Sequence, residues 1–196
     1  MAERVISGTP VSEPLFTLRP ASAADYQWLW QLKRQTMRPY VEQTWGTWDE
    51  AAQEAFFRRN FSSETVQIIQ VDDQNAGLLN VEQERGELFL ANLQISPAWQ
   101  NRGLGTAVIR TVLESARSLQ HSVRLQVLRV NTAALRLYAR LGFVAYHETP
   151  THLLMRWRSR LGRTGVGEQR PYNKSTSSRF SGIDVGALLA DARSLH

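Results

Sequence analysis

The periodicity of apolar residues between Val66 and Ile95 constrains the fold of this chain more than any other feature. Apolar side chains there recur at every second position in three runs, separated by the turn signals Asp72-Asp73-Gln74-Asn75 and Arg85-Gly86. When apolar residues recur with a period of two, alternate side chains lie on opposite faces of a strand. The segment therefore predicts an antiparallel meander of three strands.

A strand and a helix are predicted before the meander. After a short strand at residues 15–19, Ser22 and Asp25 stand at the spacing of a capping box, and apolar residues then recur at intervals of three and four. This pattern predicts a helix of about four turns. Pro39 is expected to end it.

The next residues, 40–48, are aromatic and polar and are expected to form a loop. Thr47 and Glu50 form a second capping-box pattern, which predicts a helix that ends near Asn60. The two predicted helices thus flank an aromatic loop.

Helices and strands alternate after the meander. Pro97 ends the meander, Asn131 is expected to cap a helix, and Gly142 is expected to close that helix at its C′ position. The predicted elements are a helix over about 103–119, a strand over 123–130, a helix over 131–141, and strands over 143–147 and 153–157. This order predicts a single domain of mixed α/β or α+β class.

The composition excludes several classes of protein. Because the chain has no cysteine, disulfide frameworks, thiolate nucleophiles and zinc–cysteine or iron–sulfur sites are excluded. The four histidines are scattered without metal-ligand spacing, so no metal is expected. Lysine and arginine outnumber aspartate and glutamate by 23 to 18. Most of this excess lies after residue 158, and the balanced body argues against a nucleic-acid partner.

Three segments differ in character. Residues 1–14 are polar and predict a flexible lead-in, residues 15–158 carry the alternating elements, and residues 159–196 are rich in Gly, Ser and Arg. The last segment predicts a flexible basic tail, with a functional arm as the alternative. The sequence shows no signal-peptide pattern and no run of about 18 apolar residues, so we expect a cytoplasmic protein without a membrane partner.

A glycine-bearing loop lies between the last strand of the meander and the following helix. It reads Gln100-Asn101-Arg102-Gly103-Leu104-Gly105-Thr106. A helix N-terminus presents unpaired N–H groups, and glycines let an anion approach the main chain, so a pyrophosphate fits there. The loop lacks the lysine of a P-loop and the third glycine of a dinucleotide fingerprint. An ordinary strand-to-helix turn is the alternative interpretation.

A second motif, Asn131-Thr-Ala-Ala-Leu-Arg-Leu-Tyr-Ala-Arg-Leu-Gly-Phe143, follows about 25 residues later. With the Gln-x-x-Gly-x-Gly loop and the order of elements over residues 15–158, it makes the sequence closely resemble the Gcn5-related N-acetyltransferases, the GNAT superfamily. The resemblance implies a GNAT-like fold, with a central, mostly antiparallel mixed sheet flanked by helices. It also implies acetyl-CoA as the cosubstrate.

The resemblance carries the family's CoA contacts onto residues of this chain. It assigns pyrophosphate binding to the backbone of Gln100, Asn101, Arg102, Gly103, Leu104, Gly105 and Thr106, and pantetheine binding to the main chain of Leu93, Gln94 and Ile95. It also implies that Asn131 contacts CoA and that the Tyr138 phenol protonates the leaving thiolate. A core tyrosine with a satisfied hydroxyl is the alternative for Tyr138.

The acceptor amine must be uncharged when it attacks the thioester, so a base or a water chain has to take its proton. The carboxylate that several family members use would fall near Phe89, which cannot serve. Glu87 and Glu42 are therefore the candidate bases, and Asn92 is a candidate for orienting a water. A solvated or structural role is the alternative for each.

The segment between the first two helices commonly lines the acceptor pocket in this family. The resemblance thus implies Tyr40, Trp45 and Trp48, beside Glu42, as contacts for a cationic amine. Helix packing is the alternative for the tryptophans. His147 and His152 lie near the end of the fold, where reaching the acceptor pocket is one interpretation. A structural role, which is more common for isolated histidines, is the alternative.

The expected function is direct transfer of the acetyl group from acetyl-CoA to a primary amine of a small molecule, protein or peptide, in a ternary complex. A backbone N–H near Leu93 is expected to stabilise the oxyanion. Two alternatives remain, because fold does not fix function. One is a CoA-binding sensor or partner-binding module with little turnover, and the other is an acetyltransferase that its basic tail brings to RNA or the ribosome. A monomer or a homodimer is expected.

Overall fold

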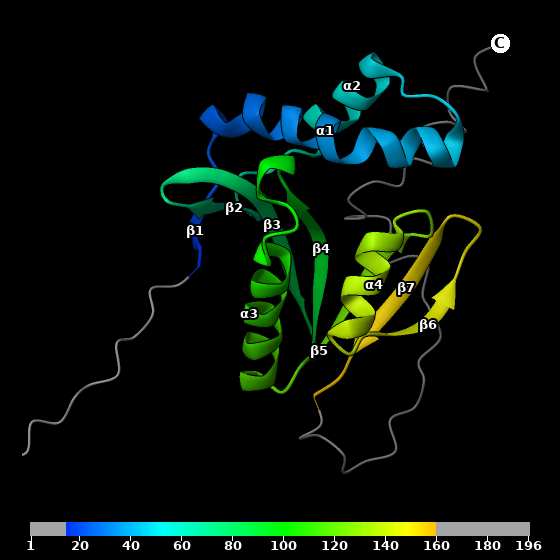
Figure 1. Ribbon diagram of the computed structural model, residues 1–196. Helices are drawn as coiled ribbons and strands as arrows, with labels where there is room; N and C mark the ends of the chain where they lie inside the picture. The colour runs from blue at the N-terminus through cyan, green and yellow to red at the C-terminus, as the bar shows by residue number, and fades with distance from the viewer. Residues whose placement is uncertain (1–14, 160–196) are drawn as a thin grey trace, which may run out of the picture.

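The meander forms the centre of a larger sheet in the computed structural model, which describes residues 15–159 (Figure 1). Its strands are β2 (Val66–Val71), β3 (Gln74–Glu84) and β4 (Glu87–Ile95), and the others are β1 (Thr17–Pro20), β5 (Ser122–Leu128), β6 (Val144–Glu148) and β7 (His152–Trp157). The strand order is β1-β2-β3-β4-β5-β7-β6, and every neighbouring pair is antiparallel except β4–β5. The predicted meander and the mixed sheet are both confirmed.

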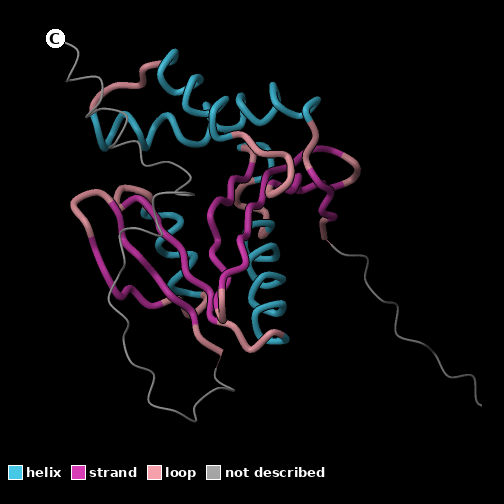
Figure 2. The backbone as a smooth tube through the Cα atoms, turned by 180° about the vertical axis from the view of Figure 1, so that it is seen from behind, coloured by secondary structure: helices cyan, strands magenta, loops and turns pink. Residues whose placement is uncertain are grey.

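Helices cover both faces of this sheet (Figures 1 and 2). They are α1 (Tyr26–Trp45), α2 (Glu50–Asn60), α3 (Leu104–Ser118) and α4 (Thr132–Arg140), with short 3-10 turns at Ala23–Asp25 and Pro97–Trp99. Successive residues of a strand point to opposite faces. Ile68 packs in a cluster with Leu29 of α1, whereas its neighbour Ile69 packs in a cluster with Val108 of α3. α1 and α3 therefore cover opposite faces, and α4 lies on the same face as α3.

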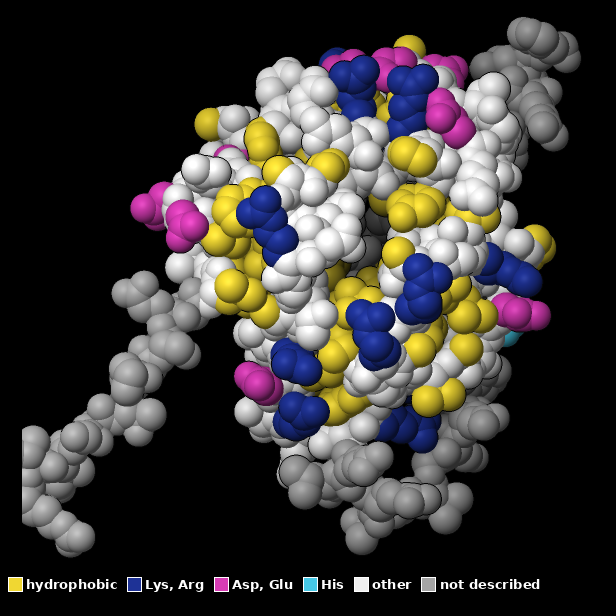
Figure 3. All heavy atoms as spheres, in the orientation of Figure 1, with side chains coloured by type: hydrophobic (Ala, Val, Ile, Leu, Met, Phe, Trp, Pro, Cys, Tyr) yellow, Lys and Arg dark blue, Asp and Glu magenta, His cyan; other side chains and the backbone are white. Residues whose placement is uncertain are grey.

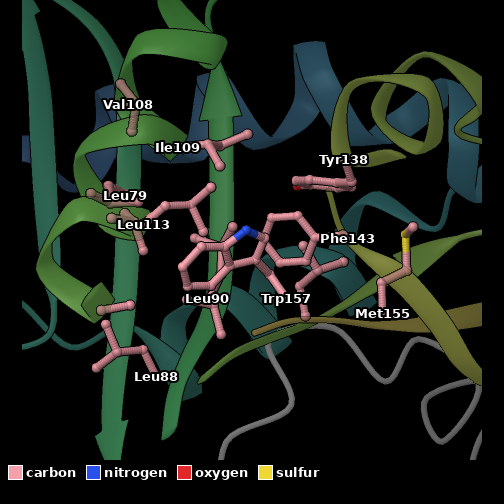
Figure 4. Close-up of a cluster of buried hydrophobic side chains, with 14 of the residues drawn as sticks. Leu79, Leu88, Leu90, Val108, Ile109, Leu113, Tyr138, Phe143, Met155 and Trp157 are labelled. Atoms are coloured by element: carbon pink, nitrogen blue, oxygen red, sulfur yellow. The ribbon is translucent and has the colours of Figure 1, made fainter. Parts of the chain in front are cut away.

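The larger apolar cluster lies under α3. This helix buries Leu104, Val108, Ile109, Val112, Leu113 and Ala116. Their spacing of three and four residues puts them on one side of the helix. They pack against the sheet together with Tyr138, Phe143 and Trp157 (Figure 4). The core thus reaches from α3 to α4 beneath the space between the two helices.

β4 and β5 separate halfway along the sheet. Their parallel ladder joins only Glu87–Leu90 of β4 to Ser122–Leu125 of β5. The register of β3 against β4 shifts between Asn80 and Val81, a bulge that leaves Ala91 without a partner in that ladder. Bulges bend a strand and increase its twist. Beyond Leu90 the two strands diverge, and the sheet opens as a V (Figure 1).

Two predictions around the first helices are wrong. Pro39 does not end α1, which continues to Trp45, so residues 40–45 are helical rather than part of a loop. Proline removes one backbone donor, but the following turn is held by the burial of Val41, which is 1% exposed, and by a bond of 2.7 Å from Thr44 Oγ1 to the Tyr40 carbonyl. The cap of α2 is Asp49 rather than Thr47, since the Asp49 carboxylate accepts from Ala52 N at 2.9 Å.

The predicted termini of α4 are confirmed. Asn131 Oδ1 accepts from Ala134 N at 3.1 Å, and Gly142 takes a left-handed φ of +89°. Phe143 N donates to the Tyr138 carbonyl at 3.0 Å and Gly142 N to the Ala139 carbonyl at 3.0 Å, which is the Schellman pattern. The N-terminal lead-in and almost all of the basic tail lie outside the described residues. None of the helices within residues 15–159 combines the length and apolarity that a membrane span needs.

Candidate functional site

A cleft lies in the V between β4 and β5. Its volume is about 770 Å³ when the space open to solvent is included. Figure 3 shows the surface hollowed at this place, between α3 and α4 and below α1. The lining residues are Met37, Phe89, Leu90, Ala91, Asn92, Leu93, Gln126, Val127, Leu128, Asn131, Ala134, Tyr138 and His152. The divergence of two strands that are paired at their other end therefore creates the cavity.

One wall of the cleft is the edge of β4. The ladder with β3 continues to Ile95, whereas the ladder with β5 stops at Leu90. The main chain from residue 91 to 95 thus has no β5 partner, and Ala91, Asn92 and Leu93 of this segment line the cleft. Such an edge pairs readily with an extended ligand. The buried Gln94 side chain fixes this segment, since it accepts from Thr36 Oγ1 at 2.7 Å and donates to Asn92 Oδ1 at 3.1 Å.

The glycine loop continues from this edge into the N-terminus of α3. Gln100 Nε2 donates to the Ile95 carbonyl at 2.8 Å, which ties the loop to the end of β4. Asn101 and Gly103 take left-handed φ values of +59° and +84°. Ala107 N is bonded to the Gly103 carbonyl, so the N–H groups of the preceding first turn have no acceptor within the helix. Positive potential and N–H donors therefore meet at the end of the β4 edge.

The other predicted residues of the loop shape its surface. Arg102 is exposed, and its guanidinium carbon lies 5.2 Å from the centre of the Trp99 ring. A Cβ added at Gly105 would lie 3.6 Å from Leu137 Cδ2 of α4. Thr106 lies in the first turn of α3 and is half-buried. The loop as a whole offers main-chain donors, with one arginine beside them.

Tyr138 of α4 lies in the opposite wall. Its side chain is 9% exposed and packs on Phe143, with ring centres 5.6 Å apart. Figure 4 shows its hydroxyl pointing away from α4 toward β4. Burial raises the pKa of Tyr138 to about 12, because an ionised phenol is poorly solvated there. The hydroxyl therefore stays protonated at neutral pH, and the residue both belongs to the core and faces the cleft.

Asn131 and Asn92 also line the cleft. The Asn131 carboxamide oxygen is used to cap α4, so this residue holds the helix that carries Tyr138. Together the structure brings Leu93, Asn92, Asn131 and Tyr138 to one cavity. The described lining does not include Gln94, Ile95 or the glycine loop, which follow Leu93 along the chain toward α3.

The two predicted carboxylate bases do not line this cavity. Glu87 lies at the paired end of β4, where it accepts from Ser122 Oγ and Arg156 Nε, each at 2.9 Å, and lies 3.1 Å from Arg124 Nε. Glu42 is on the exposed side of α1 and pairs with Arg38 at 2.8 Å. Both carboxylates are ion-paired away from the cleft.

The three aromatic residues that were predicted to contact the acceptor do not lie together in the structure. Trp48 stacks on Trp30 with ring centres 6.2 Å apart and donates to Glu50 Oε2 at 2.7 Å, so it packs α1 against α2. Tyr40 lies in α1 and does not line the cleft. The Trp45 ring lies 6.3 Å from the ring of His152, which does line it. Only Trp45 of the three lies next to the lining.

Nine of the thirteen lining residues are not among the predicted site residues, and they include Met37, Gln126 and His152. Met37 and Gln126 carry no motif. For His152 the sequence leaves two interpretations open, because a histidine without a partner at a diagnostic spacing is more often structural than catalytic. The signal for His152 is topological, since β7 pairs with the diverging half of β5 and places Leu128 opposite His152.

Comparison with known proteins places this geometry among acetyltransferases. The model of the acetyltransferase (GNAT) family matches residues 26–143. None of the curated proteins compared with the chain matches it in sequence. Solved structures do match it in fold. PaiA N-acetyltransferase from Thermoplasma acidophilum, in complex with coenzyme A, superposes with a TM-score of 0.61 at 16% identity, over 74% of this chain and 99% of that one.

Two further structures show the same fold. The ribosomal-protein-S18-alanine N-acetyltransferase of Escherichia coli has a TM-score of 0.54 at 19% identity, over 80% of this chain and 99% of its own. YncA of Salmonella typhimurium, a putative acetyltransferase with its cofactor acetyl-CoA, has a TM-score of 0.51 at 16% identity, over 80% of this chain and 99% of its own.

Proposed function

This chain belongs to the acetyltransferase (GNAT) family, and on that premise we propose that it transfers the acetyl group of acetyl-CoA directly to the nitrogen of a primary amine. The observation that carries the proposal is one continuous surface. The unpaired edge of β4 lines the cleft as far as Leu93, and the chain then continues through Gln94, Ile95 and the glycine loop to the N–H groups at the start of α3. An extended arm with amides at one end and a pyrophosphate at the other fits such a surface.

Each part of acetyl-CoA has residues that suit it. The amides of the pantetheine arm would pair with the main chain of Leu93, Gln94 and Ile95, although the Ile95 carbonyl already accepts from Gln100. The pyrophosphate would lie on the N–H groups of residues 101–106, with Arg102 as a further cation. The thioester would then lie where β4 and β5 diverge, close to Asn92, Asn131 and Tyr138.

This placement supports a direct reaction. The amine nitrogen attacks the thioester carbon, and a main-chain N–H near Leu93 stabilises the developing oxyanion. The Tyr138 hydroxyl, which stays protonated, gives its proton to the leaving sulfur. Burial raises the pKa of thiols as well as phenols, so a thiolate expelled into this cleft is a stronger base than it is in water.

Neither Glu87 nor Glu42 has a part in this proposal, because their carboxylates are ion-paired outside the cleft. No residue of the described lining is an aspartate or a glutamate. That observation favours, as the second candidate, a CoA-binding module with little turnover. The third interpretation, recruitment to RNA or the ribosome, depends on residues after 159 and is a separate proposal about the tail.

A thiol-release assay across an amine panel tests the first candidate against the second. The full chain is incubated with acetyl-CoA and, in turn, spermidine, tyramine, glycinamide and a peptide with an N-terminal alanine. We expect CoA release that depends on one of these amines, with the acetylated amine confirmed by mass spectrometry. Saturable acetyl-CoA binding without release with any amine would instead support the sensor.

A further inference from the structure

We propose that His152 takes the proton from the attacking amine, a role that rests on the acetyl transfer proposed above. His152 is the first residue of β7 and lines the cleft, where it is 8% exposed. In the ladder between β5 and β7, His152 lies opposite Leu128 of β5. Tyr138 lines the same cleft from α4. An imidazole and a phenol thus meet at one cavity from different elements.

The imidazole is held in a fixed orientation. Its Nδ1 lies 2.8 Å from Thr151 Oγ1, and the backbone N–H of His152 donates to Thr149 Oγ1 at 2.9 Å. The ring of Trp45, at the end of α1, lies 6.3 Å away. When Nδ1–H donates to the Thr151 hydroxyl, the basic lone pair of the ring lies on Nε2. A second group that fixes the tautomer is typical of catalytic histidines.

Ion pairs join charged side chains of the elements that precede and border β7. Arg129, which follows β5, lies 3.6 Å from Glu148 at the end of β6. On α1, Arg38 and Glu42 lie 2.8 Å apart. Within the described lining, the titratable side chains are Tyr138 and His152 alone. Because Tyr138 keeps its proton at neutral pH, the group that accepts a proton there is His152.

The proposed step balances in atoms and protons. At pH 7 the amine arrives as an ammonium ion, whose first proton passes to the His152 imidazole and from there to solvent. The neutral nitrogen then attacks, the N–C bond forms, the C–S bond breaks, and the second proton of the nitrogen passes to the imidazole. The sulfur leaves with the electron pair of the C–S bond and takes the proton of the Tyr138 hydroxyl. Transfer of a proton from imidazolium to phenolate through solvent then restores both residues. The products are the amide and CoA with its thiol.

The pH dependence of His152→Gln tests this role. The substrate is the panel amine that the wild-type chain acetylates with the highest kcat/KM. We expect kcat/KM to fall ~100-fold at pH 7, within the range for loss of a general base. The difference in kcat/KM between the wild type and His152→Gln should narrow as the pH approaches the pKa of the amine, because the amine then arrives uncharged. The affinity for acetyl-CoA should change far less than kcat/KM, since the proposed contacts of the pyrophosphate lie in the glycine loop and not at His152.

His147→Gln is the matched control, because His147 lies on the adjacent strand β6 and is exposed. The His147→Gln variant should keep the wild-type pH profile of kcat/KM. A profile of His152→Gln that superposes on the wild type would overturn the role of His152 and leave the acetyl transfer standing. If the wild-type chain acetylates no amine of the panel, the proposed function fails and this step fails with it.

Thr151→Val provides a second test if His152→Gln does not fold. This variant keeps the imidazole and removes the hydroxyl beside Nδ1. We expect the acidic limb of the kcat/KM profile to move while acetyl-CoA affinity stays the same. An unmoved limb would overturn the proposal.

Discussion

Gly103 and Gly86 are a matched pair that separates folding from binding. Both hold left-handed backbone, with φ of +84° and +76°, and a Cβ added at either meets nothing within 4 Å. Gly103 caps α3 beside the cleft, whereas Gly86 lies in the turn between β3 and β4. A substitution therefore causes similar backbone strain at both positions, but only Gly103 lies in the loop that is proposed to bind the pyrophosphate.

We predict that Gly103→Ala and Gly86→Ala each lower the free energy of unfolding by about 1 kcal/mol, because alanine disfavours positive φ. Gly103→Ala should also weaken acetyl-CoA binding roughly tenfold, since its methyl group intrudes where the pyrophosphate approaches the amides; tenfold corresponds to about 1.4 kcal/mol. Urea unfolding and calorimetric titration measure the two effects. Equal acetyl-CoA affinities in both variants would contradict the assignment of the loop.

Lys33 of α1 is a buried cation, and the helical periodicity of the sequence places it on the same face as Leu29 and Trp30. It is 3% exposed, and its Nζ lies between 5.3 and 5.9 Å from the centres of four aromatic rings. Nζ also donates to the Gln53 carbonyl at 3.4 Å. Burial lowers the pKa of Lys33 from 10.5 to about 8. The aromatic faces partly offset that cost through cation–π attraction.

The lowered pKa makes folding stability depend on pH in a defined direction. Between about pH 8 and 10.5 the unfolded chain binds more protons at this lysine than the folded chain does, so the free energy of unfolding rises with pH. We predict that Lys33→Met is more stable than the wild type at pH 7, by up to about 3 kcal/mol. The difference should shrink toward pH 10.5. Urea unfolding at several pH values measures it, and a difference that does not change with pH would contradict the prediction.

At the scale of elements, local signals were predictable and tertiary ones were not. The Asn131 cap and the Gly142 terminus of α4 depend on residues a few positions apart, and both are confirmed. Pro39 carries an equally local signal, but the burial of Val41 and the bonds of the next turn keep α1 helical. Packing overrides a local preference when it supplies more free energy than one missing hydrogen bond costs.

The candidate bases show the same limit of prediction from sequence. A strand pattern places Glu87 on β4, but it does not say which end of β4 opens into a cleft. That depends on where the β5 ladder stops, and on Arg124 and Arg156 from two other strands, which pair with the carboxylate. His152 enters the site for the reverse reason, since only the β5–β7 register brings it there.

Glu87 joins three strands at the closed end of the V. We predict that Glu87→Gln lowers the free energy of unfolding by about 1–3 kcal/mol, because two arginines lose a half-buried ionic partner. The variant should keep the wild-type kcat, since the carboxylate lies outside the cleft. Urea unfolding and the thiol-release assay measure the two quantities together. A large loss of kcat in a variant of normal stability would restore Glu87 as a base.

At the scale of the whole molecule, the cleft follows from how one sheet is built. Its strands are closed at one end by the β4–β5 ladder and opened at the other by a bulge in β4. α1 covers one face, α3 and α4 cover the other, and the open end lies between α3 and α4 (Figures 1 and 3). The order of elements and the glycine loop were predictable from the sequence. The volume of the cavity and the lack of carboxylates in its described lining were not, because they depend on the divergence of two strands.

The central claim is that this cleft and loop together hold acetyl-CoA. Calorimetric titration of the full chain with acetyl-CoA tests it most directly, because it needs no knowledge of the acceptor. We predict saturable binding of one acetyl-CoA per chain, with a Kd below about 100 μM, the weaker part of the range typical for cosubstrates. No heat of binding at millimolar acetyl-CoA would contradict the account.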